Sequence, residues 1–380
     1  MKASADVVII GAGVTGAALA YTLAKRGLRD VLVLERRFPG AGATGRCGGG
    51  IRQQFTTAPN IRLAMGSVRI YEQLSQELDC DIEYVQGGYL ILAETEGELE
   101  LQRRAVALQN DLGLPSRSLS PGEVRELVPL FDTATIAGAT FCPTDGHANP
   151  FRVVEGYLRA AQRLGVTLEK FTQVTDLMVR GNRVVEVVTS RGRISPGVVV
   201  NAAGAWSKEI AHMADVELPN QPVRHEILIT EPVQPITEVM VISLHTGLYF
   251  SQTVSGQILG GIGDPEERPG YNLRSSLKFL RRFLRELVRH VPALGQLSVL
   301  RQWTGFYDVT PDAQPVLGPT PGLENFIQAN GYSGHGFMIA PKVAEILADY
   351  IEHGEVSEDL ARLSLARFEG EVEGEGFVVG

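Results

Sequence analysis

Three glycines near the start of the chain have the spacing that holds a dinucleotide. A short apolar segment, residues 7–10, runs into Gly-Ala-Gly-Val-Thr-Gly at residues 11–16. Gly11 would permit the tight turn from strand to helix, Gly13 would let the backbone approach a pyrophosphate, and Gly16 would let helix and strand pack closely. The pyrophosphate would then bind the free N–H groups at the positive end of that helix.

An acidic residue completes this pattern. Glu35 ends a second apolar segment, residues 31–34, and follows the last glycine by about 20 residues, where a carboxylate can accept hydrogen bonds from ribose hydroxyls. The combination of strand, glycines, helix and acid in register indicates a dinucleotide-binding site far more specifically than the glycines alone. We therefore expect an adenine dinucleotide as ligand.

Further segments rich in small residues lie far along the chain. They are residues 40–50, residues 201–206 (Asn-Ala-Ala-Gly-Ala-Trp) and residues 330–338 (Asn-Gly-Tyr-Ser-Gly-His-Gly-Phe-Met). So many glycines predict a backbone held against a flat or bulky ligand. A nicotinamide would leave the later glycine-rich turns unexplained, which disfavours it as the redox cofactor.

The elements that position these segments can be predicted from apolar periodicity. We expect helices over residues 15–26, 60–77, 96–112, 121–128, 149–164, 276–291 and 336–353. We expect strands over residues 7–10, 31–34, 88–93, 169–172, 183–189, 197–201, 226–230, 249–253, 257–261 and 325–329. The predicted fold class is α/β, with a Rossmann-like cofactor domain and an interleaved substrate domain built on a mixed antiparallel sheet.

The domains are predicted to alternate along the chain. The cofactor domain takes residues 1–85, 150–215 and 300–380, and the substrate domain takes residues 86–149 and 216–299. Such interleaving is typical of flavoproteins. A chain of 380 residues with 44% hydrophobic content can also fill two cores, since single cores stop growing at about 250 to 300 residues.

Composition excludes several classes of partner. The formal net charge of −9 argues against nucleic acid or an anionic membrane as the main partner. No apolar stretch approaches the ~20 residues that a membrane span needs. The three cysteines are far apart, so we expect neither disulfides nor a metal site, and a cytoplasmic location.

At this point the chain resembles the glycine/D-amino-acid oxidase superfamily, and especially the β subunits of heterotetrameric sarcosine oxidase and dye-linked L-proline dehydrogenase. The segments that carry the resemblance are residues 45–55, 143–151, 201–206 and 333–338. The resemblance implies FAD as cofactor. It places adenosine contacts at Glu35 and Arg36, and the flavin ring beside residues 334–338.

The cofactor contacts implied in this way form a long set. They are Gly11, Gly13, Val14, Thr15, Gly16, Glu35, Arg36, Ala43, Thr44, Arg46, Cys47, Gly48, Gly49, Val174, Ala203, Gly204, Trp206, Gly305, Gly334, His335, Gly336, Phe337 and Met338.

Flavin-dependent amine oxidation also needs an anchor for the substrate carboxylate, and the planar fork of arginine suits it. Arg52 is the first candidate and Arg46 the second, although either could instead pair structurally or contact phosphate. Tyr307 and Tyr249 are candidate pocket aromatics, with core packing as the alternative for Tyr249. His335 resembles the family's helix-start histidine, a flavin neighbour rather than a base.

A histidine outside these segments stays open between two roles. His225 could belong to the substrate site or be structural.

Departures from the family pattern refine the expectation. Gly305 stands where monomeric sarcosine oxidases carry the cysteine that bonds FAD, so noncovalent FAD is expected. Met338 and Ile258 or Leu259 occupy positions where several oxidases carry a lysine that promotes reaction with oxygen, which favours a dehydrogenase. Relatives that hold FMN at a subunit interface sometimes bond it to a histidine, and His147 lies near that region.

The predicted function is FAD-dependent oxidation of the C–N bond of a small secondary amino acid, sarcosine or L-proline, to an imine. Oxidation of glycine or a D-amino acid is one alternative, and a non-catalytic FAD-carrying subunit is another. Beyond the amino-acid substrate, the expected partners are FMN at an interface and an α-type subunit, or a second copy of the chain.

Overall fold

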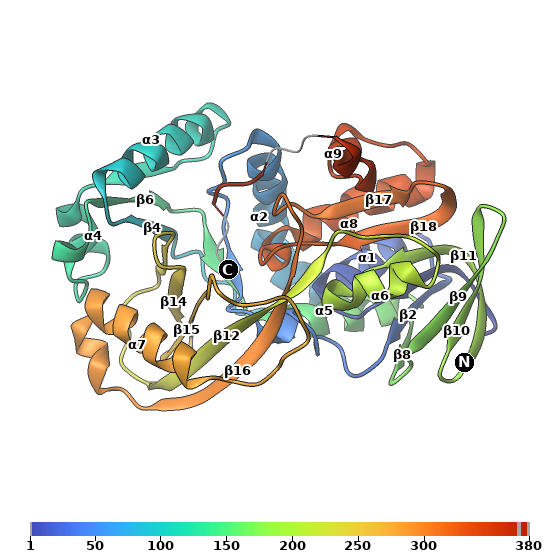
Figure 1. The fold of residues 1–380 in the computed structure, drawn as a ribbon, viewed down its shortest axis with the longest axis horizontal. Coiled ribbons are helices and arrows are strands. Elements are labelled where there is room, and N and C mark those ends of the chain that lie inside the picture. The colour runs from blue at the N-terminus through green and yellow to red at the C-terminus, as the bar shows by residue number, and fades with distance from the viewer. Residues whose placement is uncertain (1, 371–373, 378–380) are drawn as a thin grey trace.

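The computed structural model describes residues 2–370 and 374–377. It contains two large mixed sheets (Figure 1). The first sheet is built on five parallel strands: β1 (Ser4–Ile10), β2 (Val31–Glu35), β8 (Thr167–Lys170), β11 (Gly192–Asn201) and β18 (Leu323–Asn330). Three more strands join it in antiparallel pairs: β9 (Val174–Arg180), β10 (Arg183–Thr189) and β17 (Val316–Thr320).

Helices cover one face of the first sheet. They are α1 (Val14–Lys25), α2 (Ala58–Leu78), α5 (Pro150–Arg163) and α8 (Gly336–His353). In α1 the residues from Val14 to Ala20 are all buried, because α5 and α8 pack on it from two sides while the sheet lies beneath. The opposite face packs on α6 (Ser207–His212) and on the β9–β10 hairpin.

The second sheet runs in the order β16-β12-β15-β14-β13-β4-β6-β5. Its strands are β4 (Tyr89–Ala93), β5 (Arg117–Leu119), β6 (Gly138–Cys142), β12 (Gln221–Pro232), β13 (Met240–Ser243), β14 (Leu248–Gln252), β15 (Gln257–Ile262) and β16 (Val299–Val309). Only the β4–β13 pair among these neighbours is parallel.

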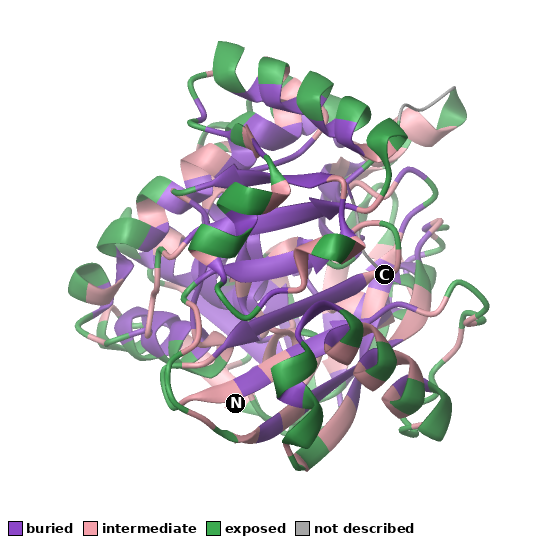
Figure 2. Cartoon of the chain, turned by 90° about the vertical axis from the view of Figure 1, so that its left-hand side faces the viewer, coloured by how far each residue is buried: buried purple, intermediate pink, exposed green. Residues whose placement is uncertain are grey.

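Three helices accompany the second sheet: α3 (Glu96–Asp111), α4 (Pro121–Leu127) and α7 (Leu277–His290). Helix α7 turns Phe279, Phe283 and Leu287 onto the sheet and leaves Arg281 and Arg285 exposed. Figure 2 shows this pattern across the molecule, with buried strands behind helices whose outward faces are exposed. No helix in the described part of the chain is long and apolar enough to cross a membrane.

The predicted α/β fold class is confirmed, and most predicted elements appear within a few residues of their expected ends. The strand expected over residues 169–172 is shifted, because β8 pairs with β2 from Thr167 to Lys170 and Phe171 then adopts a positive φ of 55°. Strand β16 belongs to the second sheet, which differs from the predicted division, where residues from 300 onward lie in the cofactor domain.

Short elements complete the chain. A two-stranded pair, β3 (Gly50–Ile51) with β7 (Gly146–His147), stands apart from both sheets. Helix α9 (Glu358–Arg362) packs near β17. Short 3-10 helices lie over Thr44–Arg46, Thr133–Thr135, Gly204–Trp206, Pro292–Gln296 and Leu365–Glu369.

Candidate cofactor and substrate site

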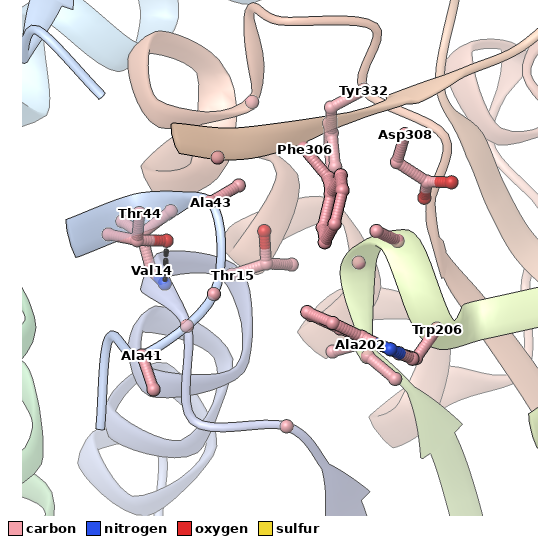
Figure 3. Close-up of a pocket in the computed structure, with 18 of the residues that line it drawn as sticks. Val14, Thr15, Ala41, Ala43, Thr44, Ala202, Trp206, Phe306, Asp308 and Tyr332 are labelled. Atoms are coloured by element: carbon pink, nitrogen blue, oxygen red, sulfur yellow. Dashed lines mark hydrogen bonds between the residues drawn. The ribbon is translucent and has the colours of Figure 1, made fainter. Parts of the chain in front are cut away.

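A long pocket runs from the carboxyl ends of β1 and β2 to the second sheet (Figure 3). The residues that line it come from segments far apart in the sequence: 10–11, 13–15, 34–37, 41–44, 46–47, 172–174, 202–206, 305–308, 332, 334 and 336–337. In open α/β sheets, ligands bind outside the carboxyl ends of the strands. The predicted glycine-rich segments therefore meet around one space.

The start of α1 forms the first end of the pocket. Gly13 is its N-cap, with no side-chain cap among the described residues and no acid in the first turn. The Val14 N–H donates to the Thr44 hydroxyl at 3.1 Å, which ties the loop over residues 41–47 to this helix (Figure 3). An uncapped helix N-terminus that opens into a pocket suits a phosphate.

The glycine turn before α1 leaves no room for side chains. Gly11 has φ +111°, and a Cβ atom there would lie 2.4 Å from the Ala202 carbonyl oxygen. A Cβ atom at Gly16 would lie 2.0 Å from the Gly11 carbonyl oxygen, so Gly16 serves the close packing that the sequence predicts. Two chain segments can approach this closely only because both positions are glycine.

Glu35 lies beside the turn and already has two backbone donors. Its Oε2 accepts from the Ala12 N–H at 3.1 Å, and its Oε1 accepts from the Arg37 N–H at 2.8 Å. A carboxylate has about four lone-pair sites, so it can also accept from hydroxyl groups of a ligand. The acidic end of β2 thus fits a ribose.

Stacked side chains form the wall near this end. The Arg36 guanidinium lies 3.7 Å from the centre of a Trp206 ring, and Tyr271 stacks on the same side chain at 5.9 Å. Val174 at the start of β9 also lines the pocket. The result is a flat, partly apolar surface, which suits an aromatic base.

The start of α8 forms the other end of the pocket. Its N-cap, His335, makes no side-chain cap in the described structure, and Gly334 before it has φ +93°. A Cβ atom at Gly334 would lie 2.7 Å from the Tyr307 ring, so the tyrosine packs directly against the turn. A second uncapped helix N-terminus therefore opens into the same pocket, where it can stabilise developing negative charge.

Three aromatic side chains form a stack above this end. The His225 ring lies 4.4 Å from the Tyr307 ring at an interplanar angle of 8°, and 5.6 Å from the Tyr249 ring at 15°. His225 Nε2 and the Tyr249 hydroxyl are 3.1 Å apart. Burial lowers the pKa of His225 to about 4, so the imidazole is neutral at physiological pH.

Arg52 is buried, with an exposed fraction of 3%. Its Nη1 donates to the Gln54 carbonyl and its Nη2 to the Phe377 carbonyl, both at 2.5 Å, and its guanidinium lies 4.4 Å from the Phe55 ring centre. Among the residues that the structure describes, no carboxylate comes within 4.0 Å of it. Burial lowers the pKa of Arg52, while the charges of Glu375 and Asp145 oppose that shift.

A buried carboxylate fixes the chain next to Arg52. Asp145 accepts from the Gln53 N–H at 2.8 Å, from Gln53 Nε2 at 3.0 Å and from Gln54 Nε2 at 3.0 Å. Burial raises the pKa of Asp145 to about 6, against the effect of these hydrogen bonds. The network holds residues 50–54 in place, and with them the arginine.

Most of the predicted residues line the pocket, and six do not. Gly16, Gly48, Gly49, Arg52, His335 and Met338 are not among the residues that line it. A Cβ atom at Gly48 would lie 3.2 Å from the Tyr249 ring, so this glycine lies next to the aromatic stack. The His335 ring is 3% exposed, and burial lowers its pKa to about 4.

Sequence reasoning missed several lining residues. Tyr332 and Asp308 both line the pocket (Figure 3), and the Asp308 Oδ2 accepts from the Gly331 N–H at 2.7 Å. Burial raises the pKa of Asp308 to about 7. Tyr332 lies inside a glycine-rich segment that could have pointed to it, whereas His225 has no local pattern that would separate it from a structural histidine.

Comparisons with known proteins agree with this arrangement. The family model described as DAO, FAD dependent oxidoreductase, matches residues 6–350. The sarcosine oxidase subunit beta of Rhodobacter capsulatus is 32% identical over 99% of this chain and 91% of its own length. Glycine oxidase of Geobacillus kaustophilus is 30% identical over 97% of this chain and 98% of its own length.

A solved structure is also similar over nearly the whole chain. L-proline dehydrogenase from P. horikoshii superimposes with a TM-score of 0.93 and 37% identity, over 97% of this chain and 99% of that one. The pocket and the two uncapped helix ends that open into it agree with these matches. The chain belongs to the FAD dependent oxidoreductase (DAO) family.

Proposed function

We propose that the protein oxidises the C–N bond of a small secondary amino acid, sarcosine or L-proline, to an imine with noncovalently bound FAD. The observation that carries the proposal is Arg52, a buried guanidinium with no carboxylate partner in the described structure, set against the Phe55 ring. A buried charge without a counter-ion is costly, and a substrate carboxylate would supply that counter-ion. The names of two matched proteins, sarcosine oxidase and L-proline dehydrogenase, support the substrate class.

The residues present fit FAD. The start of α1 and Thr44 would hold the pyrophosphate, Glu35 the adenosine ribose, and Gly334 to Phe337 the flavin. When bound, FAD supplies the electron sink that accepts a hydride from the carbon next to the substrate nitrogen. Gly305 offers no side chain to bond the cofactor, and a Cβ atom there would lie 3.1 Å from the Arg46 side chain, which supports noncovalent binding.

The chain's own residues would bind and orient the substrate. Arg52 would hold the carboxylate by two parallel hydrogen bonds, and this fixes the direction in which the amine extends. Tyr249, Tyr307 and His225 would enclose the amine and exclude water. Because burial disfavours the charged form of an amine, and because His225 is neutral there, the enclosure favours the neutral amine that oxidation requires.

The product follows from the balance of the reaction. Loss of a hydride from the α or N-methyl carbon leaves an iminium ion, which loses its N–H proton to give the imine. Water would hydrolyse an open imine, whereas the imine from L-proline would remain cyclic. We propose a dehydrogenase that passes its electrons to an acceptor other than oxygen, either in a complex with an α-type subunit and with FMN at the subunit interface, or in a homo-oligomer.

The test uses the purified chain under anaerobic conditions. Flavin released by denaturation is identified first, and it should be FAD released in full, because we expect no covalent bond. The holoprotein is then mixed with sarcosine, L-proline and glycine in turn while the visible flavin absorbance is followed. Bleaching by sarcosine or L-proline supports the proposal, whereas an absorbance that no amine changes would identify a subunit that only carries FAD.

Glycine oxidation is a second candidate, because glycine oxidase of Geobacillus kaustophilus matches 97% of the chain. Faster bleaching by glycine than by either secondary amino acid would favour it. Readmission of oxygen to the reduced protein then separates an oxidase, which recovers its absorbance quickly, from a dehydrogenase, which does not.

A further inference from the structure

A short segment near the end of the sequence, residues 374–377, lies over the start of α2. Glu375 accepts hydrogen bonds from the Thr56 N–H at 2.8 Å, the Thr56 hydroxyl at 2.5 Å, the Thr57 hydroxyl at 3.0 Å and Asn60 Nδ2 at 2.8 Å. Burial alone would raise the pKa of Glu375, but these hydrogen bonds outweigh it and lower the pKa. The carboxylate therefore anchors the segment as a charged group.

Phe377 extends from this anchor into the second sheet. Its side chain is 8% exposed and packs in one apolar cluster with Tyr89, Met240 and Tyr249. Its carbonyl oxygen accepts from Arg52 Nη2 at 2.5 Å. Phe377 thus contacts the arginine to which we assign the substrate carboxylate, and it belongs to the same apolar cluster as the pocket aromatic Tyr249.

We propose that residues 374–377 form the end wall of the substrate chamber, with Phe377 setting the size of the amino acid that fits and orienting Arg52. The inference rests on the proposed function, because it gives Arg52 the role of carboxylate anchor. It assigns Phe377 as a specificity-determining residue and Glu375 as a positioning residue.

The orientation of Arg52 follows from its contacts. A guanidinium has five N–H donors in a fixed plane, and the Gln54 and Phe377 carbonyls each hold one terminal nitrogen while Phe55 covers one face. Displacement of the backbone at Phe377 would remove its carbonyl from Arg52 Nη2, and only the Gln54 carbonyl would then hold a terminal nitrogen of the guanidinium. Because bidentate binding depends on that plane, a loose arginine should bind a carboxylate less well.

The size limit follows from packing. A buried phenylalanine that shares a cluster with Tyr249 and Met240 occupies volume that a bulkier substrate would need. Truncation of a large buried side chain leaves a cavity that the surroundings fill only in part. A smaller residue at position 377 should therefore admit larger carboxylates while it weakens the binding of small ones.

The test measures binding of carboxylate inhibitors of graded size to the FAD-loaded protein. Acetate, pyrrole-2-carboxylate and benzoate are titrated while perturbation of the flavin absorbance is followed, so turnover is not needed. For Phe377→Ala we expect acetate to bind about tenfold more weakly and benzoate to bind no more weakly than before, so that the ratio of the two dissociation constants shifts toward benzoate. Phe377→Leu should lie between the two.

Two further variants distinguish a segment that limits the substrate chamber from a segment that only stabilises the fold. Glu375→Ala removes the anchor and should shift the ratio in the same direction as Phe377→Ala, because both release the wall. Phe171→Ala, at a side chain that is 68% exposed, is the matched control and should leave the ratio unchanged. FAD content and melting temperature are recorded for each variant.

The outcomes are separable from those of the function test. An unchanged inhibitor ratio in Phe377→Ala and Glu375→Ala would overturn the inference, even if amines bleach the flavin of the wild-type protein. Wild-type protein that binds none of the three carboxylates would overturn it as well. A shifted ratio with no bleaching by any amine would support the wall and contradict the proposed function.

Discussion

The two ends of the pocket are built in different ways. At the cofactor end, Gly11, Gly13 and Glu35 act through tight turns, free N–H groups and a strand end, all within 25 residues of sequence. At the proposed substrate end, His225, Tyr249 and Tyr307 line the pocket, while Arg52 and Phe377 lie outside its lining, and the five come from separate segments. Recognition by the backbone leaves a local pattern in the sequence, whereas recognition by side chains from many elements leaves almost none.

The largest effect should come from the cofactor end. Gly16→Ala places a Cβ atom 2.0 Å from the Gly11 carbonyl oxygen, which is backbone and cannot move aside. We expect the variant to lose FAD, with a flavin content below a tenth of the wild-type value by visible absorbance after gel filtration, or to fail to fold.

The matched control is Gly97→Ala, whose Cβ meets nothing within 4 Å at the start of α3. It should keep its FAD and gain about 0.5 kcal/mol in free energy of unfolding. Full flavin retention by Gly16→Ala would contradict the close packing that we assign to this turn.

At the substrate end, Arg52→Lys should weaken substrate binding without loss of cofactor. Lysine keeps the charge but cannot form two parallel hydrogen bonds, and we expect KM to rise about 100-fold, equivalent to roughly 3 kcal/mol. Flavin content should stay near the wild-type value, because Arg52 is not among the residues that line the pocket. Equal losses of substrate affinity and flavin would place Arg52 in the cofactor site. The cofactor end and the substrate end would then not be separate in the way proposed.

A smaller effect is expected for Tyr249→Phe. The variant removes the hydroxyl that lies 3.1 Å from His225 Nε2, and a buried polar atom left unpaired costs about 1–3 kcal/mol. We expect the anaerobic rate of flavin reduction to fall about tenfold. A rate equal to that of the wild type would show that the stack serves only to fill space.

The smallest effect concerns stability against pH. Burial lowers the pKa of both His225 and His335 to about 4 in the folded protein, while an unfolded histidine titrates near 6.5. Between these values the unfolded chain binds protons that the folded protein does not, so stability falls as pH falls. From pH 6.5 to 5.5 each histidine should cost about 1 kcal/mol of unfolding free energy.

Urea unfolding at the two pH values measures this loss. His335→Gln removes one titrating group and should reduce the pH-dependent loss by that histidine's share. An equal slope in wild type and His335→Gln would contradict the buried neutral state of His335.

The contrast also explains what could be predicted from sequence. The strand, turn and helix around Gly11 could be predicted because each local preference there agrees with the fold. Arg52 could be proposed as an anchor from the sequence. Its hydrogen bond to the Phe377 carbonyl could not, because that residue lies more than 320 positions later. His225 could not be separated from a structural histidine, because its neighbours Tyr249 and Tyr307 come together only when β12, β14 and β16 share a sheet.

The most direct test of the account compares two amines that differ only in a carboxylate. L-proline and pyrrolidine are each mixed with the FAD-loaded protein without oxygen, and the initial rate of flavin bleaching is measured at equal concentrations. If Arg52 anchors the substrate, L-proline, or sarcosine in the parallel pair with dimethylamine, should bleach the flavin at least 100-fold faster. Equal rates for the acid and its decarboxylated partner, or no bleaching by either, would contradict the account.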